Sequence, residues 1–135
     1  MINRLPGMEK NETLISLKDI LQTLKTEGKI AIALLYGSYL KGQPHSRSDI
    51  DLALYLQTKD GIEEMEIIDR ILMSTEKEVS ILRLHDEEES PFVVQEALKG
   101  EHLVEPDWEI YYSLSHRILH ECEDLRYRRE LRVMK

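Results

Sequence analysis

Residues 37–56 have the sequence GSYLKGQPHSRSDIDLALYL. A Gly-Ser pair opens the stretch, ten residues follow, and Asp-Ile-Asp then opens a run in which leucines occupy every second position. This period of two predicts a strand over 49–56. Because residues i and i+2 of a strand project to the same side, the strand would hold the carboxylates of Asp49 and Asp51 side by side. Two such carboxylates repel each other, and a divalent cation removes the conflict.

The residue types around this pair favour magnesium and a phosphorylated ligand. Mg²⁺ prefers oxygen ligands and is usually bound by one or two carboxylates together with substrate phosphates. Gly37 and Ser38 directly follow an apolar run, where a glycine lets backbone amides approach a phosphate and a serine hydroxyl can donate to it. Lys41, three positions after Ser38, is a candidate for a further phosphate contact. We therefore expect Asp49 and Asp51 to bind the metal, and Gly37, Ser38 and Lys41 to bind the ligand.

Each half of the pattern also has an ordinary explanation. Gly-Ser after a strand is common turn chemistry, a lone Asp-x-Asp is more often an exposed strand end than a metal site, and Lys41 alone would be a surface lysine. The combination is rarer, since four specified positions at fixed spacing occur by chance in on the order of one chain of this length in several hundred. We therefore interpret both halves as parts of one site.

Outside this stretch, predicted helices and strands interleave. Helical spacing of apolar residues, Gly, Pro and Asp boundaries and continuous apolar runs predict the elements. The expected helices cover 11–27, 60–75, 90–100 and 107–133, and the expected strands cover 30–36, 49–56 and 78–84, with a short strand or turn at 102–106. Such an order predicts an α/β or α+β fold in which helices pack on a small mixed sheet.

Three of these helices carry an apolar face, and Asp60 and Asp107 are the expected N-caps of the second and the last. The expected faces are Leu14, Leu17, Ile20, Leu21 and Leu24 in the first helix, Ile62, Met65, Ile68, Ile71 and Leu72 in the second, and Trp108, Ile110, Leu114, Ile118, Leu125 and Leu131 in the last.

Composition narrows the class of protein. A length of 135 residues fits a single domain over 1–135. The net charge of −8 argues against a main role in holding a nucleic-acid backbone. No apolar run is long enough to cross a bilayer, the N-terminus lacks the apolar core of a signal peptide, and the single cysteine fits a reducing compartment. We expect a cytoplasmic protein without direct membrane or nucleic-acid contacts.

Charge is nevertheless unevenly distributed along the chain. Residues 86–89 are acidic and residues 126–135 are basic. Solvated faces explain both, and a basic tail that meets an acidic partner or RNA is the alternative.

The string GS, ten residues, DxD resembles the signature of the DNA polymerase β-like nucleotidyltransferase superfamily. The short chain is similar to the minimal nucleotidyltransferases, the MNT proteins paired with HEPN-domain toxins. The resemblance implies a polymerase β-like fold, two Mg²⁺ ions on Asp49 and Asp51, and an ATP triphosphate held by Ser38 and the Gly37 backbone. It also implies transfer of AMP from ATP to a hydroxyl. In MNT antitoxins of type VII-like pairs this is a tyrosine of the HEPN RNase toxin, which is thereby silenced.

The chain departs from the family pattern at a third carboxylate, which a neighbouring strand normally supplies. Ser80 stands at that place in the strand predicted over 78–84, and Glu78, two residues away on the same face, is the candidate substitute. If Glu78 replaces it, we expect an active transferase. Without a third carboxylate, the chain would neutralise its toxin mainly by binding. A small-molecule nucleotidyltransferase of the aminoglycoside type is a third hypothesis.

Overall fold

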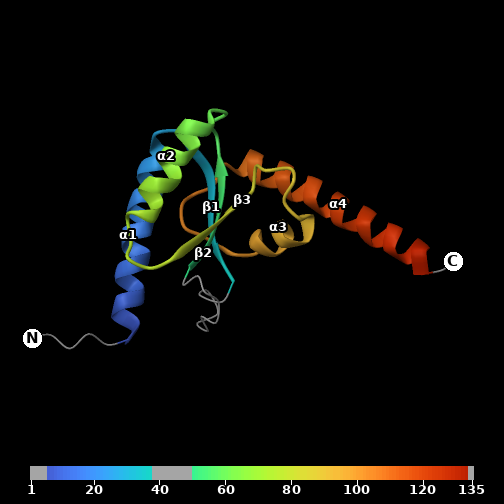
Figure 1. The fold of residues 1–135 in the computed structure, drawn as a ribbon, viewed down its shortest axis with the longest axis horizontal. Helices are drawn as coiled ribbons and strands as arrows, with labels where there is room; N and C mark the ends of the chain where they lie inside the picture. Colours follow the sequence, from blue (N-terminus) through green and yellow to red (C-terminus); the bar gives the residue numbers. More distant parts are fainter. Residues whose placement is uncertain (1–5, 38–49, 134–135) are drawn as a thin grey trace, which may run out of the picture.

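The computed structural model describes residues 6–37 and 50–133, with side chains from Glu12 onward. These residues form a mixed sheet with helices packed on it, which confirms the predicted α+β class (Figure 1). The elements are α1 (Pro6–Thr26), β1 (Ile30–Tyr36), β2 (Ile50–Leu56), α2 (Gly61–Leu72), β3 (Val79–Arg83), α3 (Pro91–Ala97), β4 (Glu101–His102) and α4 (Trp108–Val133).

The helix boundaries follow the predicted caps. Asp60 accepts a hydrogen bond from the backbone N–H of Ile62 at 3.0 Å, and Asp107 accepts one from the N–H of Ile110 at 3.2 Å. Each carboxylate satisfies a backbone donor that has no partner within its helix. The first helix is longer than predicted, because α1 begins at Pro6 rather than at Asn11.

The four strands lie in the order β3-β2-β1-β4. β1 is antiparallel to β2 and to β4, whereas β2 and β3 are parallel and α2 connects them, as a parallel pair requires. Tyr36 at the end of β1 is paired with Asp51 of β2, and Asp51 is paired with Ser80 of β3. The C-terminal end of β1 therefore meets the N-terminal ends of β2 and β3 at one edge of the sheet.

Helices cover both faces of the sheet, α1 and α2 on one side and α3 and α4 on the other (Figure 1). Every residue of β1 before Tyr36 is buried, which is the environment predicted from its continuous apolar run. The predicted apolar face of α1 is confirmed, since Leu17, Leu21 and Leu24 are fully buried. The strand that carries Asp51 is therefore packed against a hydrophobic core on each of its two faces.

The predicted apolar face of α2 is confirmed only in part, because Ile71 is buried and Ile68 packs partly buried against the core, but the other predicted members are exposed. Ile62 and Met65 are 71% and 66% exposed, whereas Ile67 and Ile71 are buried. Glu64 lies on the same face as these two isoleucines, at positions i, i+3 and i+7, and its carboxylate binds the Arg83 guanidinium of β3 at 2.7 Å. This ion pair and the two isoleucines together select one of two apolar stripes that the sequence offers.

The predicted apolar face of α4 is covered only in its first half. Leu114 and Ile118 are buried together with Cys122, but Leu125 and Leu131 are 39% and 45% exposed. The helix continues past the elements on which it packs (Figure 1). Although α4 is long, no helix in the described part of the chain combines the length and apolarity that a membrane crossing requires.

Leucines inside and outside this core provide a test of the packing. We expect Leu52→Ala to lower the free energy of unfolding by about 2–5 kcal/mol, because Leu52 is fully buried in β2 and its loss leaves a cavity. Leu131→Ala makes the same chemical change on an exposed helix face and should stay within about 0.5 kcal/mol. Urea unfolding measures both, and equal losses would contradict the described core.

Candidate active site

Gly37 and the Asp51 carboxylate are in close contact at the edge of the sheet. Gly37 follows β1 in the left-handed region, with φ 77°, which favours glycine. A Cβ atom built at this position would lie 2.5 Å from Oδ2 of Asp51. The glycine is therefore needed both for its backbone conformation and for the space that the carboxylate occupies.

Asp51 itself is a partly buried carboxylate, and burial raises its pKa above the ordinary value. Among the side chains of residues 12–37 and 50–133, no cation forms an ion pair with it. A desolvated carboxylate without a cation is unfavourable, and a bound cation would remove that cost. The chemistry of Asp51 therefore fits a metal ligand.

Tyr36 pairs with Asp51 across the antiparallel strands, so the two side chains project to the same face. Burial raises the pKa of the Tyr36 hydroxyl, and the negative charges of Asp51 and Glu89 raise it further. A neutral phenol therefore stands among carboxylates here. The sequence patterns did not point to Tyr36, although its position directly before Gly37 was a usable signal. They did not point to Glu89, because an acidic loop resembles a solvated surface.

On the other side of Asp51 lies β3, with Ser80 in the paired position. Ser80, at the position where the resemblance predicted a third carboxylate, is thus a direct neighbour of Asp51 on the same face. Glu78 is exposed just before β3, and its backbone carbonyl accepts a hydrogen bond from the Ile50 N–H at 3.1 Å. Strand alternation directs its side chain to the face of Ser80 and Asp51.

Three of the predicted site residues, Ser38, Lys41 and Asp49, lie outside the described residues. Their roles stay predictions. Within the part that is described, no three His, Cys, Asp or Glu side chains gather closely enough to hold a metal. The predicted metal pair depends on Asp49 beside Asp51.

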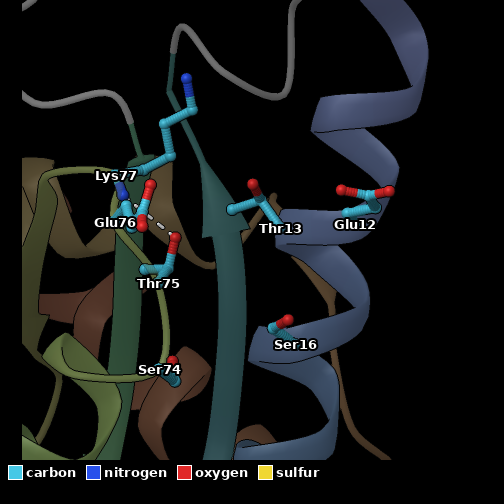
Figure 2. Close-up of a pocket in the computed structure, with 7 residues that line it drawn as sticks. All are labelled: Glu12, Thr13, Ser16, Ser74, Thr75, Glu76 and Lys77. Atoms are coloured by element: carbon cyan, nitrogen blue, oxygen red, sulfur yellow. Dashed lines mark hydrogen bonds between the residues drawn. The ribbon is translucent and has the colours of Figure 1, made fainter. Parts of the chain in front are cut away.

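A polar cavity of about 410 Å³ lies between α1 and the loop that leads from α2 to β3. Figure 2 shows its lining, in which the Lys77 side chain points in the direction in which β1 ends. The backbone N–H of Lys77 donates to the Thr75 hydroxyl at 3.1 Å and holds the loop. No sequence pattern indicated this cavity, which is lined by Glu12, Thr13, Ser16, Ser74, Thr75, Glu76 and Lys77.

The sequence over residues 18–109 matches the family model of polymerase β nucleotidyltransferases. The chain belongs to this nucleotidyltransferase family. The matched region includes all four strands, and with them Gly37, Asp51 and Ser80. No curated protein matches the chain.

Several solved structures share the fold of this nucleotidyltransferase. A chain in a toxin-antitoxin structure with AMP-PNP is 20% identical, with a TM-score of 0.63 over 86% of this chain and 94% of that one. A chain in the complex of tri-AMPylated Shewanella oneidensis HEPN toxin with MNT antitoxin is 18% identical, with a TM-score of 0.63 over 90% and 95%. A chain of the toxin-antitoxin MntA-HepT is 17% identical, with a TM-score of 0.61 over 88% and 94%. These likenesses confirm the polymerase β-like fold.

The contact between Gly37 and Asp51 can be tested with a second left-handed glycine as control. Gly28 has φ 75° but open space where its Cβ would lie, so Gly28→Ala should cost about 1–2 kcal/mol from backbone strain alone. Gly37→Ala adds a clash with Asp51 and should cost more. In an Asp51→Ala background we expect this excess to fall, while the cost of Gly28→Ala is unchanged. Urea unfolding of the double-mutant cycles measures the coupling, and its absence at Gly37 would contradict the contact.

The burial of Asp51 predicts a pH-dependent stability difference. Because its folded pKa is raised, the ionised carboxylate costs stability above that pKa, and the cost vanishes as the pH falls below the unfolded value of about 4. We expect metal-free Asp51→Asn to melt above wild type at pH 7, with the gain shrinking toward pH 3. Asp69→Asn, at an exposed position of α2, is the control. A variant that melts below wild type at pH 7 would show that Asp51 has a cationic partner in the protein.

Proposed function

We propose that this nucleotidyltransferase is the antitoxin of a type VII-like pair and transfers AMP from ATP to a tyrosine of a HEPN-domain toxin. The observation that carries the proposal is the partly buried Asp51 carboxylate at the edge of a polymerase β-like sheet, where the absence of a side chain at Gly37 leaves room for it. Structures of similar fold include a toxin-antitoxin with AMP-PNP and a tri-AMPylated HEPN toxin in complex with MNT antitoxin, which supports both the nucleotide and the acceptor.

The residues at this edge fit a Mg²⁺-nucleotide complex. Asp51 offers an oxygen ligand with no described cationic partner, and Asp49 would complete the pair. Bound Mg²⁺ stabilises charge on the attacking and the leaving oxygens of an in-line displacement. Gly37 and Ser38 would bind the triphosphate through a backbone N–H and a hydroxyl, and Lys41 would add a cation.

The transfer forms one bond and breaks one bond at the α-phosphorus of ATP. The acceptor oxygen bonds to that phosphorus, the bond to the bridging oxygen breaks, and pyrophosphate leaves. The acceptor hydroxyl loses its proton, and a carboxylate at the sheet edge is the natural base. Glu78, which is exposed and on the same strand face as Asp51, would replace the missing third carboxylate and help to hold the metal.

The pairing of Ser80 with Asp51 supports a second candidate, an antitoxin that binds its toxin without efficient transfer. An uncharged hydroxyl occupies the position where the family pattern has a carboxylate. Glu78 and Glu89 are the described carboxylates that could compensate, from the start of β3 and from the loop before α3. A small-molecule acceptor of the aminoglycoside type is the third candidate, and the labelling experiment below includes it.

Transfer of label from ATP distinguishes these functions. The chain is incubated with α-labelled ATP, Mg²⁺ and a candidate HEPN-domain partner protein, with Asp69→Asn as a charge-matched control for Asp51→Asn. We expect label on a tyrosine of the partner with wild type and with the control, and a loss of at least about 100-fold with Asp51→Asn. Label that survives this substitution would contradict the proposed site. A tight complex without label would favour binding alone, and label on an aminoglycoside would favour the third candidate.

Substitutions on β3 test the third carboxylate. We expect Ser80→Asp to raise the transfer rate by about tenfold, because it adds a metal-directed carboxylate beside Asp51. Glu78→Gln should lower the rate by about tenfold or more if Glu78 replaces the missing group, and Glu89→Gln is the matched comparison. Initial rates at saturating ATP measure all three. If only Glu89→Gln lowers the rate, the loop rather than β3 supplies the carboxylate.

A further inference from the structure

The C-terminal part of α4 is exposed to solvent. Cys122 is the last buried residue of the helix, and every residue from Glu123 to Val133 is exposed. Figure 1 shows this part of α4 extending beyond the rest of the molecule. Helices in proteins are stabilised mainly by the packing of one face, and in the described part of the chain the Phe92 side chain of α3 is the contact recorded for this segment of α4.

A groove of about 540 Å³ lies where this part of α4 passes α3. Leu125, Arg128, Arg129 and Arg132 share one helix face, since they are spaced i, i+3, i+4 and i+7. Phe92 of α3 contributes a second apolar side chain, and the Arg126 guanidinium stands 5.5 Å from the centre of its ring. We call this the α4 groove, and its lining residues are Phe92, Leu125, Arg126, Arg128, Arg129 and Arg132.

The charge of the α4 groove is opposite to that of the chain. Arginines dominate its lining, although the net charge of the protein is −8. Arg128 binds Asp124 at 3.2 Å. Arg126, Arg129 and Arg132 form no ion pair with any carboxylate in the described part of the chain. These three guanidinium groups are therefore available to an acidic ligand.

We propose that the α4 groove docks an acidic segment of the HEPN-domain toxin that carries an apolar anchor, an inference that rests on the proposed function. Arginines around an apolar centre are typical of protein interfaces, where aromatic and arginine side chains carry much of the binding energy. Phe92 and Leu125 provide that centre. RNA fits less well, because Glu123, Asp124 and Glu130 stand among the arginines and would repel a phosphate backbone.

The helices that form the α4 groove cover the face of the sheet to which the Asp51 side chain projects. Asp51 shares its strand face with Ala53, whose side chain is buried in the cluster under α3 and α4. A partner held by α3 and α4 is therefore on the side toward which Asp51 projects. Docking in the groove would bring the acceptor to that side without covering the polar cavity beside α1.

Charge reversal tests the docking. Calorimetric titration with the purified HEPN-domain protein compares wild type with Arg129→Glu/Arg132→Glu and with Lys18→Glu/Lys59→Glu, which makes the same charge change at exposed positions elsewhere. We expect the arginine variant to bind on the order of tenfold or more weakly and the lysine variant to bind like wild type. Phe92→Ala tests the apolar part separately, and far-UV circular dichroism verifies that each variant is folded.

Several outcomes would overturn the docking proposal. Full affinity of both the arginine variant and Phe92→Ala for the partner would do so, and equal weakening by the lysine control would reduce it to a general charge effect. Binding of a single-stranded RNA oligonucleotide that the arginine variant loses, with partner binding intact, would assign the groove to RNA. If the complex forms through the groove but no AMP is transferred, the docking stands and the proposed transfer fails. If wild type does not bind the partner, both fail.

Discussion

The proposed site depends on one carboxylate, that of Asp51, which is held partly out of water at the end of a buried sheet. Antiparallel pairing with β1 brings Tyr36 opposite Asp51. Gly37, which has a left-handed backbone conformation, has no side chain, and Oδ2 of Asp51 occupies the space that a Cβ atom there would need. Both neighbours are fixed by a core that is closed on each face of the sheet. Such a carboxylate is unfavourable alone and becomes favourable when a cation binds. Among the side chains that the structure describes, none with a positive charge pairs with Asp51, which fits the predicted role as a metal ligand.

Sequence patterns predicted this edge because its signals are local. The continuous apolar run of β1, the alternation in β2 and the Gly-Ser pair each depend on residues close in the chain, and the first two are confirmed. The family resemblance singled out Ser80 on the neighbouring strand, and β3 pairs this residue with Asp51. The roles of Ser38, Lys41 and Asp49 stay predictions.

The features that could not be predicted from the sequence depend on contacts between residues that are distant in the chain. In α2 the buried side is set by the packing of Ile67 and Ile71 on the core, and Glu64 on that side pairs with Arg83, which is distant in sequence. In α4 the apolar positions continue past Cys122 while the sheet and α3 do not, so the pattern could not reveal that Leu125 is uncovered. The influence of Glu89 on Tyr36 arises from a loop that folds back toward the sheet, which no periodicity encodes.

The proposed active site and the proposed docking groove lie at different places on the molecule. The edge carries the acidic residues that would handle a Mg²⁺-nucleotide, and the basic α4 groove lies on the side of the sheet that Asp51 faces. In the functions proposed above, opposite local charges at the two places would let one chain bind a metal-nucleotide and an acidic protein segment separately.

The central claim is that Asp51 makes nucleotide binding dependent on a divalent cation. Calorimetric titration of a non-hydrolysable ATP analogue into wild type and Asp51→Asn, each with Mg²⁺ and with EDTA, tests it most directly. The account predicts that Mg²⁺ tightens binding to wild type by at least about tenfold, and that Asp51→Asn removes this gain while weak metal-free binding remains. An equal Mg²⁺-dependent gain in both proteins would contradict it.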